Sequence, residues 1–315
     1  MDGGQNSAGR GGFERRSLKP GLNLGSKPGL TPGFAIAATV LAVILWGFSP
    51  IGTRYMVGTG FAGMPAMAFT GLRYTLAALI FSPLLWQARH WNRRDWALGL
   101  ICGLVGVAGY NIPAALGQRS VSAGLTGLLD GVEPLFIVLF SAIAQRRFPA
   151  PLTIIATFIG LAGVVLLAQG SGPALGDPEG DALVLLAAVL WAIYCVIVPA
   201  LINRRGALPT TAVTIMFGAI PMLLSGLPQM QGMLITMTGW DWLVTITLTL
   251  GTSVIAMLAW NAGSAVLGAE KAGWYLYLLP VVSLIGGALL LGEPVRLWEL
   301  AGGALVLLAV YLSQR

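Results

Sequence analysis

Residues 272–314, AGWYLYLLPVVSLIGGALLLGEPVRLWELAGGALVLLAVYLSQ, have a recognisable second version earlier in the chain. That version covers residues 123–169 and reads AGLTGLLDGVEPLFIVLFSAIAQRRFPAPLTIIATFIGLAGVVLLAQ. Pro134 matches Pro280 at a spacing of 146 residues, and Pro149 matches Pro294 at 145. In each version two apolar runs flank a short charged break. A run of about twenty apolar residues is long enough to cross the hydrocarbon layer as a helix, so this stretch predicts a membrane-spanning helical hairpin that occurs twice.

The bulk composition leads to the same class of protein. Of the 315 residues, 56% are hydrophobic and 10% are charged, and the mean hydropathy is +0.81. Soluble domains carry about 25% charged residues, so the composition predicts a polytopic membrane protein. The net charge of +6 does not indicate nucleic-acid binding, because the basic residues lie in the tail and short loops, where membrane topology accounts for them.

Ten apolar segments follow an amino-terminal tail, residues 1–33, which we expect to be disordered and cytoplasmic because it is rich in Gly, Ser, Lys and Arg. The predicted spans are 34–56, 65–87, 96–117, 121–144, 151–169, 181–202, 209–227, 241–263, 271–291 and 296–313. With a cytoplasmic amino terminus, fourteen Lys and Arg residues fall on the inner side and three, Arg54, Arg119 and Arg296, on the outer side. The positive-inside rule then predicts an all-α integral membrane protein of the inner (plasma) membrane, with both termini cytoplasmic.

The repeat covers five helices rather than two. Leu45-Trp46 matches Leu190-Trp191 at a spacing of 145, and Asp95-Trp96 matches Asp241-Trp242 at 146. The two halves are therefore residues 34–169 and 181–315. Because five is an odd number, the second half must enter the membrane upside down relative to the first. Inverted repeats are typical of secondary transporters, whose substrate site lies near the midplane between the halves.

Three ionisable residues fall inside predicted spans, where a charge is costly and indicates either a function or a specific partner. Arg73 and Asp130 both lie on the order of 12–14 Å from the outer end of their spans. Their matching depth predicts an ion pair or a shared polar cavity. Glu133 is three residues after Asp130, so the two carboxylates are predicted to lie on one helical face. The carboxylates are candidates for binding a cationic amine or a proton, and Arg73 for binding a carboxylate; a structural Arg73–Asp130 pair is the alternative.

Polar and aromatic side chains within the spans complete the candidate binding site. Aromatic rings give an amphipathic substrate both apolar contact and a polar group, although helix packing is an equal alternative for the mid-span pair Trp46 and Trp191. The further candidates are Tyr110, Tyr194, Trp260, Tyr275 and Tyr277, with Asn111 and Asn261 as hydrogen-bonding groups. Pro134 and Pro280 predict helix breaks that free backbone carbonyls and allow gating.

In order along the chain, several of these residues resemble the EamA-type ten-helix transporters of the drug/metabolite transporter superfamily. The resemblance rests on Trp46 and Trp191, Arg73-Tyr74, Glu133-Pro134 and the closing Gly292-Glu293-Pro294, and it covers the chain after residue 33. The first half departs from the closing motif, because Arg147-Phe148-Pro149 stands in its place. The resemblance implies export of small metabolites, often amino acids.

The sequence therefore predicts a secondary transporter that moves small amphipathic metabolites such as amino acids by alternating access at a central pocket. A multidrug or organic-cation exporter of the same fold is the first alternative, and an intramembrane lipid-modifying enzyme is a second. We expect no catalytic residues, metal ligands or cofactor. The bilayer and a small-molecule substrate are the expected partners, and the hairpins of spans 4–5 and 9–10 lie either behind the pocket or at a homodimer face.

Overall fold

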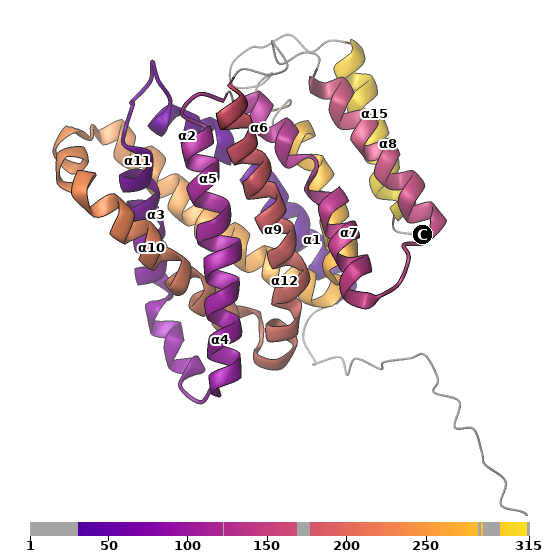
Figure 1. Cartoon of the computed structure of the whole chain (residues 1–315), viewed down its shortest axis with the longest axis horizontal. Helices are drawn as coiled ribbons and strands as arrows, with labels where there is room; N and C mark the ends of the chain where they lie inside the picture. The colour runs from indigo at the N-terminus through magenta and orange to yellow at the C-terminus, as the bar shows by residue number, and fades with distance from the viewer. Residues whose placement is uncertain (1–30, 122, 169–176, 283–284, 286–296, 314–315) are drawn as a thin grey trace, which may run out of the picture. The chain divides into compact units, whose positions relative to one another are not determined.

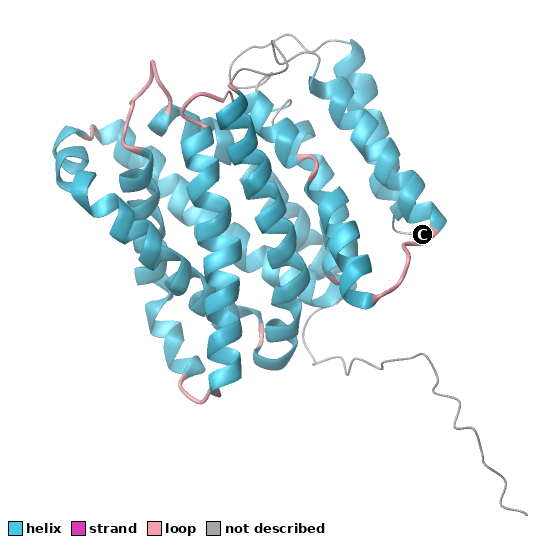
Figure 2. Ribbon diagram, viewed as in Figure 1, coloured by secondary structure: helices cyan, strands magenta, loops and turns pink. Residues whose placement is uncertain are grey.

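The computed structural model describes residues 31–121, 123–168, 177–282, 285 and 297–313. Throughout these ranges the secondary structure is helical, without a strand (Figure 2). The predicted tail up to residue 30, most of the link between the two halves, and the second half of span 9 with Gly292-Glu293-Pro294 lie outside the described residues.

Six helical stretches of the described chain are long and apolar enough to cross a membrane: Pro32–Val57, Ala66–Ala88, Arg93–Gly117, Pro178–Arg205, Ala207–Thr236 and Gly239–Leu267. They correspond to predicted spans 1, 2, 3, 6, 7 and 8. Shorter apolar helices lie at Glu133–Gln145, Pro151–Leu166 and Leu300–Leu312, within predicted spans 4, 5 and 10. The helices extend beyond several predicted boundaries, most of all span 7, because charged or turn-forming residues rather than the apolar run determine where they end.

The first half of the fold contains several interrupted helices (Figure 1). Their bounds are α1 Pro32–Gly47, α2 Ser49–Val57, α3 Ala66–Phe81, η1 Ser82–Ala88, α4 Arg93–Cys102, η2 Gly103–Ala108, α5 Gly109–Gly117, α6 Ala123–Asp130, α7 Glu133–Gln145 and α8 Pro151–Ala168. Proline begins or follows several of the interruptions, since it lacks the amide hydrogen that a helix interior needs.

The second half contains two long uninterrupted helices followed by shorter ones. The bounds are α9 Pro178–Arg205, α10 Ala207–Thr236, α11 Gly239–Leu248, η3 Thr249–Ala256, α12 Met257–Leu267, α13 Ala269–Gly273, η4 Trp274–Tyr277 and α15 Leu297–Ser313. Asp177 caps α9 and accepts hydrogen bonds from the Glu179 amide and, at 2.6 Å, from Ser120 Oγ. The hydrogen bond from Ser120 lowers the pKa of the Asp177 carboxyl below its ordinary value.

The halves share local features at the repeat spacing of 146. Asn92 and Thr238 are both amino-terminal caps, and their side chains accept from the amides of Asp95 and Asp241. Each cap is followed by one α-helical segment and then a π-helical one, η2 or η3, which begin 146 residues apart. Such π-helical turns are rare and frequent at functional sites.

Helix packing pairs equivalent elements of the two halves. α3 packs against α10 and α8 against α15, so each pair joins corresponding spans. α1 packs against α12, and α5 packs against α9, which are spans 1 with 8 and 3 with 6. This reciprocal set of contacts is what a two-fold relation between the halves produces. The core lies where α1, η2, α9 and α12 meet.

Candidate functional site

A cavity lies at the meeting point of both halves, with an empty volume of about 640 Å³ including the space at its mouth. Of the predicted site residues, seven line it: Trp46, Arg73, Tyr110, Asn111, Asp130, Glu133 and Trp191. They come from predicted spans 1, 2, 3, 4 and 6, and spans 8 and 9 add Thr252, Met257 and Leu279.

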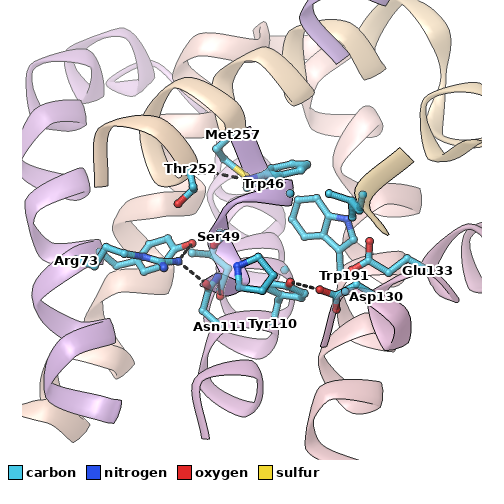
Figure 3. A pocket seen from close by; sticks show the side chains of 17 residues that line it. Trp46, Ser49, Arg73, Tyr110, Asn111, Asp130, Glu133, Trp191, Thr252 and Met257 are labelled. Carbon is cyan, nitrogen blue, oxygen red and sulfur yellow. Dashed lines mark hydrogen bonds between the residues drawn. The ribbon is translucent and has the colours of Figure 1, made fainter. Parts of the chain in front are cut away.

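Arg73 lies at one end of the cavity as Figure 3 shows it, held by neutral partners. Its guanidinium donates to Asn111 Oδ1 at 2.8 Å, to the Tyr74 hydroxyl at 3.2 Å and to Thr53 Oγ1 at 3.4 Å. The guanidinium carbon also lies 4.8 Å from the centre of the Tyr74 ring, a distance at which a cation and a ring attract. The side chain is 5% exposed, so these partners orient a buried positive charge without neutralising it.

Asp130 and Glu133 lie at the opposite end, with Tyr110 and Asn111 between them and Arg73 (Figure 3). The Tyr110 hydroxyl donates to Asp130 Oδ2 at 3.3 Å. Asp130 is 3% exposed and Glu133 2%. Within the described residues, Asp130 Oδ1 and Arg73 Nε are buried without a hydrogen-bond partner, and buried polar atoms of this kind need an explanation such as a ligand or water.

Of the two predicted arrangements of Arg73 and Asp130, the structure therefore has the shared polar cavity and not the direct ion pair. Among the described residues, ion pairs within 4.0 Å join only Asp95 to Arg204 and Arg205. Asn111 occupies the position next to the Arg73 guanidinium that a carboxylate was expected to take. Matching depth along two spans could not reveal that a third helix lies between them.

Asp130 and Glu133 both line the cavity, but they lie on two helices, and the prediction of a single helix is wrong. α6 ends at Asp130, a turn at Gly131 and Val132 follows, and α7 begins at Glu133 with Pro134 in its first turn. The helix breaks because Pro134 has no amide hydrogen to continue the bonding pattern. Glu133 consequently stands at a helix amino terminus, where the helix dipole favours a negative charge. Pro280 likewise follows a distorted turn, since it lies in the helical residues 278–282 after η4.

Aromatic rings close one side of the cavity. Trp46 contacts Trp191 edge-on, with ring centres 5.1 Å apart, and Trp260 packs against both at 5.4 and 6.0 Å. Trp46 Nε1 donates to the Thr252 carbonyl of η3 at 3.0 Å, which fixes its ring across the two halves. Trp260 is fully buried behind this pair and does not line the cavity. In the predicted orientation the cluster lies on the cytoplasmic side of the cavity.

Tyr194 and Asn261 also lie behind the aromatic cluster rather than in the cavity. The Tyr194 hydroxyl donates to Asn261 Oδ1 at 3.0 Å, and Asn261 Nδ2 donates to Thr211 Oγ1 at 2.9 Å. All three side chains are fully buried, so they form a satisfied polar layer that joins α9, α12 and α10. Their polar groups bond to one another, which is why they do not face the cavity.

The two tyrosines predicted in span 9 do not reach the cavity either. Tyr277 donates to the Thr157 carbonyl at 3.2 Å and packs on Gly160 of α8. Tyr275 is buried in the main core among apolar side chains. The 3₁₀ turn Trp274–Tyr277 changes the rotation of these side chains, an effect that the apolar pattern of the sequence does not show.

Several cavity residues were not predicted as site residues. They are Gly47, Ser49, Pro50, Tyr74, Gly106, Val107, Gly127, Thr252, Met257 and Leu279. Two of them have a signal in the sequence: Tyr74 follows Arg73, and Gly106 is one of four closely spaced glycines of predicted span 3, at 99, 103, 106 and 109. Nothing in the sequence distinguishes Thr252 or Met257 from packing residues, because their position depends on the π-helical turn η3.

Comparison with known proteins identifies the class. The profile of the EamA-like transporter family matches residues 33–169 and again residues 178–314. The chain therefore belongs to the EamA-like transporter family.

Relatives of the chain carry transporter names. An uncharacterized transporter of Archaeoglobus fulgidus is 26% identical over 87% of this chain and 96% of its own length. A probable terminal-alkyne amino-acid exporter of Streptantibioticus cattleyicolor is 28% identical, covering 89% and 93%. The uncharacterized inner membrane transporter YedA of Escherichia coli K12 is 26% identical, covering 85% and 87%. A solved crystal structure at 22% identity matches 90% of this chain and 97% of its own with a TM-score of 0.71, which shows the same fold.

These findings define a multi-pass transporter of the inner membrane, not an enzyme, that works on a small molecule in a lipid environment. The expected resemblance to the EamA-type family is confirmed.

Proposed function

We propose that this transporter exports small zwitterionic metabolites, with amino acids as the leading class. The observation that carries the proposal is the separation of charge along one buried cavity. Arg73 Nε lacks a partner near one end and Asp130 Oδ1 lacks one near the other. A zwitterion that places its carboxylate at Arg73 and its ammonium at Asp130 satisfies both atoms and neutralises both charges.

The aromatic residues suit the rest of such a substrate. Trp46, Trp191 and Tyr110 present ring surface between the two charged ends. Apolar side chains of an amino acid gain contact with these rings. The relative from Streptantibioticus cattleyicolor is named as a probable amino-acid exporter, which supports both the substrate class and the outward direction.

Alternating access is the mechanism that we infer from the arrangement of the halves. The reciprocal packing of equivalent helices supports two inverted five-helix repeats, residues 34–169 and 181–315. In the described conformation the cytoplasmic side has three closing layers. These are the tryptophan cluster, the Tyr194–Asn261–Thr211 layer, and the pairs of Asp95 with Arg204 and Arg205. Rocking of one half against the other separates Trp46 from the other two tryptophans and Asp95 from its arginines, and it exposes the cavity to the cytoplasm. The Tyr194–Asn261–Thr211 layer lies within the second half and moves with it.

A second candidate is export of organic cations. The cavity holds two carboxylates, Asp130 and Glu133, against one arginine, and cations bind well over tryptophan faces. Arg73 is the observation against this candidate, because its buried positive charge repels a second cation.

Uptake into proteoliposomes distinguishes these functions. The panel holds labelled amino acids, matched amines without a carboxylate, and organic cations, each tested with and without a pH gradient. We expect wild type to accumulate amino acids and the Glu133→Gln variant to lose the effect of the gradient. Uptake of organic cations alone would select the second candidate. Gradient-independent uptake by both proteins would identify a facilitator in which Glu133 has a structural role.

A further inference from the structure

A second cavity lies outside the transport site, as a groove between α7 and α8 with an empty volume of about 960 Å³ including its open side. Its walls are almost entirely apolar. They comprise Leu135, Leu139, Ala142 and Ile143 of α7, and Ile154 and Phe158 of α8. Ile143 and Phe158 are each 64% exposed, so the groove is open on the outer surface of the described chain.

The groove exists because α8 packs elsewhere. α8 lies along α15, and the side chains between α7 and α8 are Trp274 and Tyr277 from η4, which pack with Val138 and Ala156. These two rings fill the inner part of the gap and leave the outer part empty. The loop that joins α7 to α8 (Figure 1) contributes residues 146–149 to one end of the groove.

That end of the groove carries two arginines. Arg146 ends α7 in the left-handed conformation with φ 51°, and Arg147 follows it. Both are exposed and line the groove, together with Phe148 and Pro149. Ion pairs in the described part of the chain involve only Arg204 and Arg205, so neither Arg146 nor Arg147 has a carboxylate partner there. Arg147-Phe148-Pro149 stands in place of the Gly-Glu-Pro motif that closes the second half, so the pair of adjacent arginines belongs to the first half only.

We propose that this groove binds an anionic phospholipid of the cytoplasmic leaflet, with an acyl chain along α7 and the phosphate on Arg146 and Arg147. From Leu135 to Ile143 the helix rises about 12 Å, so an acyl chain can lie against apolar side chains up to the arginines. A basic site beside an apolar groove at the cytoplasmic face is the arrangement that recognises anionic headgroups. Glu270 of α13, a helix that packs against α7, accepts a hydrogen bond from Thr153 and does not line the groove.

A second copy of the chain is a less favourable occupant. In a two-fold interface the same surface contacts itself, so Arg146 and Arg147 of both copies would gather in one patch. An anionic lipid removes this repulsion, and a second copy increases it. The leaflet in this proposal depends on the cytoplasmic orientation of the α7–α8 loop, whereas the lipid site itself does not depend on which substrate is transported.

Native mass spectrometry of the full-length protein in detergent tests the proposal, with added dioleoyl phosphatidylglycerol or dioleoyl phosphatidylcholine. We expect wild type to retain phosphatidylglycerol at least about tenfold more tightly than phosphatidylcholine, and R146Q/R147Q to lose that preference. R93Q/R94Q is the matched control, because Arg93 and Arg94 are exposed at the same membrane face away from the groove. Ala142→Phe fills the groove and leaves both arginines intact. It should weaken retention of phosphatidylglycerol as much as R146Q/R147Q does.

Four outcomes would overturn the proposal. Equal losses in both arginine variants would show general surface electrostatics, and unchanged retention in Ala142→Phe would place the acyl chains elsewhere. Equal binding of water-soluble glycerophosphoglycerol would show an anion site without a lipid. A change in oligomeric mass on filling the groove, with lipid retention unaltered, would make it a protein interface. Size-exclusion profiles and unfolding midpoints identify any variant that fails to fold, and Leu139→Phe then replaces Ala142→Phe.

Discussion

Arg73 is a buried cation whose described partners are all neutral, and this makes it the most informative residue of the cavity. Asn111, Tyr74 and Thr53 orient its guanidinium. A buried charge in a membrane protein is costly unless a partner or a function compensates for it. Asp130 carries the opposite charge across the cavity, and in the proposed function the carboxylate of a zwitterionic substrate compensates Arg73 directly.

Substitution of Arg73 should distinguish recognition of the substrate carboxylate from recognition of its amine. We expect Arg73→Gln to lower uptake of amino acids about tenfold or more, since a lost charge-assisted hydrogen bond is worth about 1.5–3 kcal/mol. Matched amines without a carboxylate should be transported at least as well as by wild type. Asp130→Asn is the reciprocal variant and should impair amines and amino acids alike. If Arg73→Gln impairs both ligand classes equally, Arg73 has only a structural role.

Asn111 orients Arg73, and its removal should be measurable as stability. Asn111 Oδ1 accepts from Arg73 and Nδ2 donates to the Val107 carbonyl at 2.8 Å. We expect Asn111→Ala to destabilise the protein by about 1–3 kcal/mol, because the buried guanidinium loses the shortest of its hydrogen bonds. Thermal unfolding in detergent measures the change. In the double variant Asn111→Ala with Arg73→Ala, part of the loss should be recovered; a fully additive loss would show that the two side chains act independently.

At the scale of single residues, the sequence was enough to predict which charged side chains lie inside the membrane spans. It was not enough to predict which groups they bond to. Arg73, Asp130 and Glu133 are conspicuous because charges inside apolar runs need a reason. Tyr194 and Asn261 are likewise polar residues inside apolar runs, yet they form a hydrogen bond with each other behind the tryptophans and do not reach the cavity. Which way a side chain points depends on helix rotation, and the turn at Gly131 and Val132 changes that rotation within a predicted span.

At the scale of elements, glycine decides how closely α3 and α10 approach. A Cβ added at Gly226 of α10 would lie 2.5 Å from the Met67 carbonyl oxygen and 2.8 Å from Ala68 Cα, both backbone atoms of α3. Gly232, six residues further along the same helix, has nothing within 4 Å of an added Cβ. The two positions therefore form a matched pair for testing the packing of corresponding spans.

We expect Gly226→Ala to destabilise the protein by about 1–3 kcal/mol, because the backbone of α3 must move to accommodate the methyl group. Gly232→Ala should leave stability unchanged or raise it by up to about 1 kcal/mol, since alanine favours a helix over glycine. Unfolding midpoints in the same detergent give the comparison. Equal midpoints for the two variants would contradict close packing of α3 and α10 at Gly226.

The pattern of apolar runs predicted these elements but not their irregularities. Spans 3 and 8 appear continuous in the sequence, whereas η2 and η3 interrupt them as π-helical turns. A π-helical turn adds one residue to a helical turn without changing the hydropathy of the span. The apolar pattern of a single sequence therefore does not show where such a turn lies. Thr252 and Met257 enter the cavity through this irregularity and were therefore missed.

For the whole molecule in its predicted orientation, the Asp95 pairs are the closure nearest the cytoplasm, and they join the two halves directly. Asp95 at the start of α4 accepts from Arg205 Nε at 2.6 Å and pairs with Arg204 at 2.7 Å. The equivalent residue at the other face, Asp241, accepts instead from the Tyr55 hydroxyl at 2.9 Å. One face is thus held by two ion pairs and the other by a single hydrogen bond from a tyrosine to a carboxylate, so in the predicted orientation this conformation favours closure towards the cytoplasm.

Asp95→Asn should shift the population towards a cytoplasm-open state. Ser264 is a suitable reporter, because it is buried at the cytoplasmic end of α12 behind the polar layer. In a Cys102→Ala, Cys195→Ala background, a cysteine replacing Ser264 should react with an impermeant maleimide in inside-out vesicles about tenfold faster when Asp95→Asn is present. That factor corresponds to the loss of about 1.4 kcal/mol from the closed state, which is near the lower limit of the coupling energies of close charge pairs. Arg93→Gln at the same face should leave the rate unchanged. An Asp95→Asn rate equal to that of the parent protein would show that closure depends on the tryptophan cluster instead, and Trp260→Ala would then produce the increase.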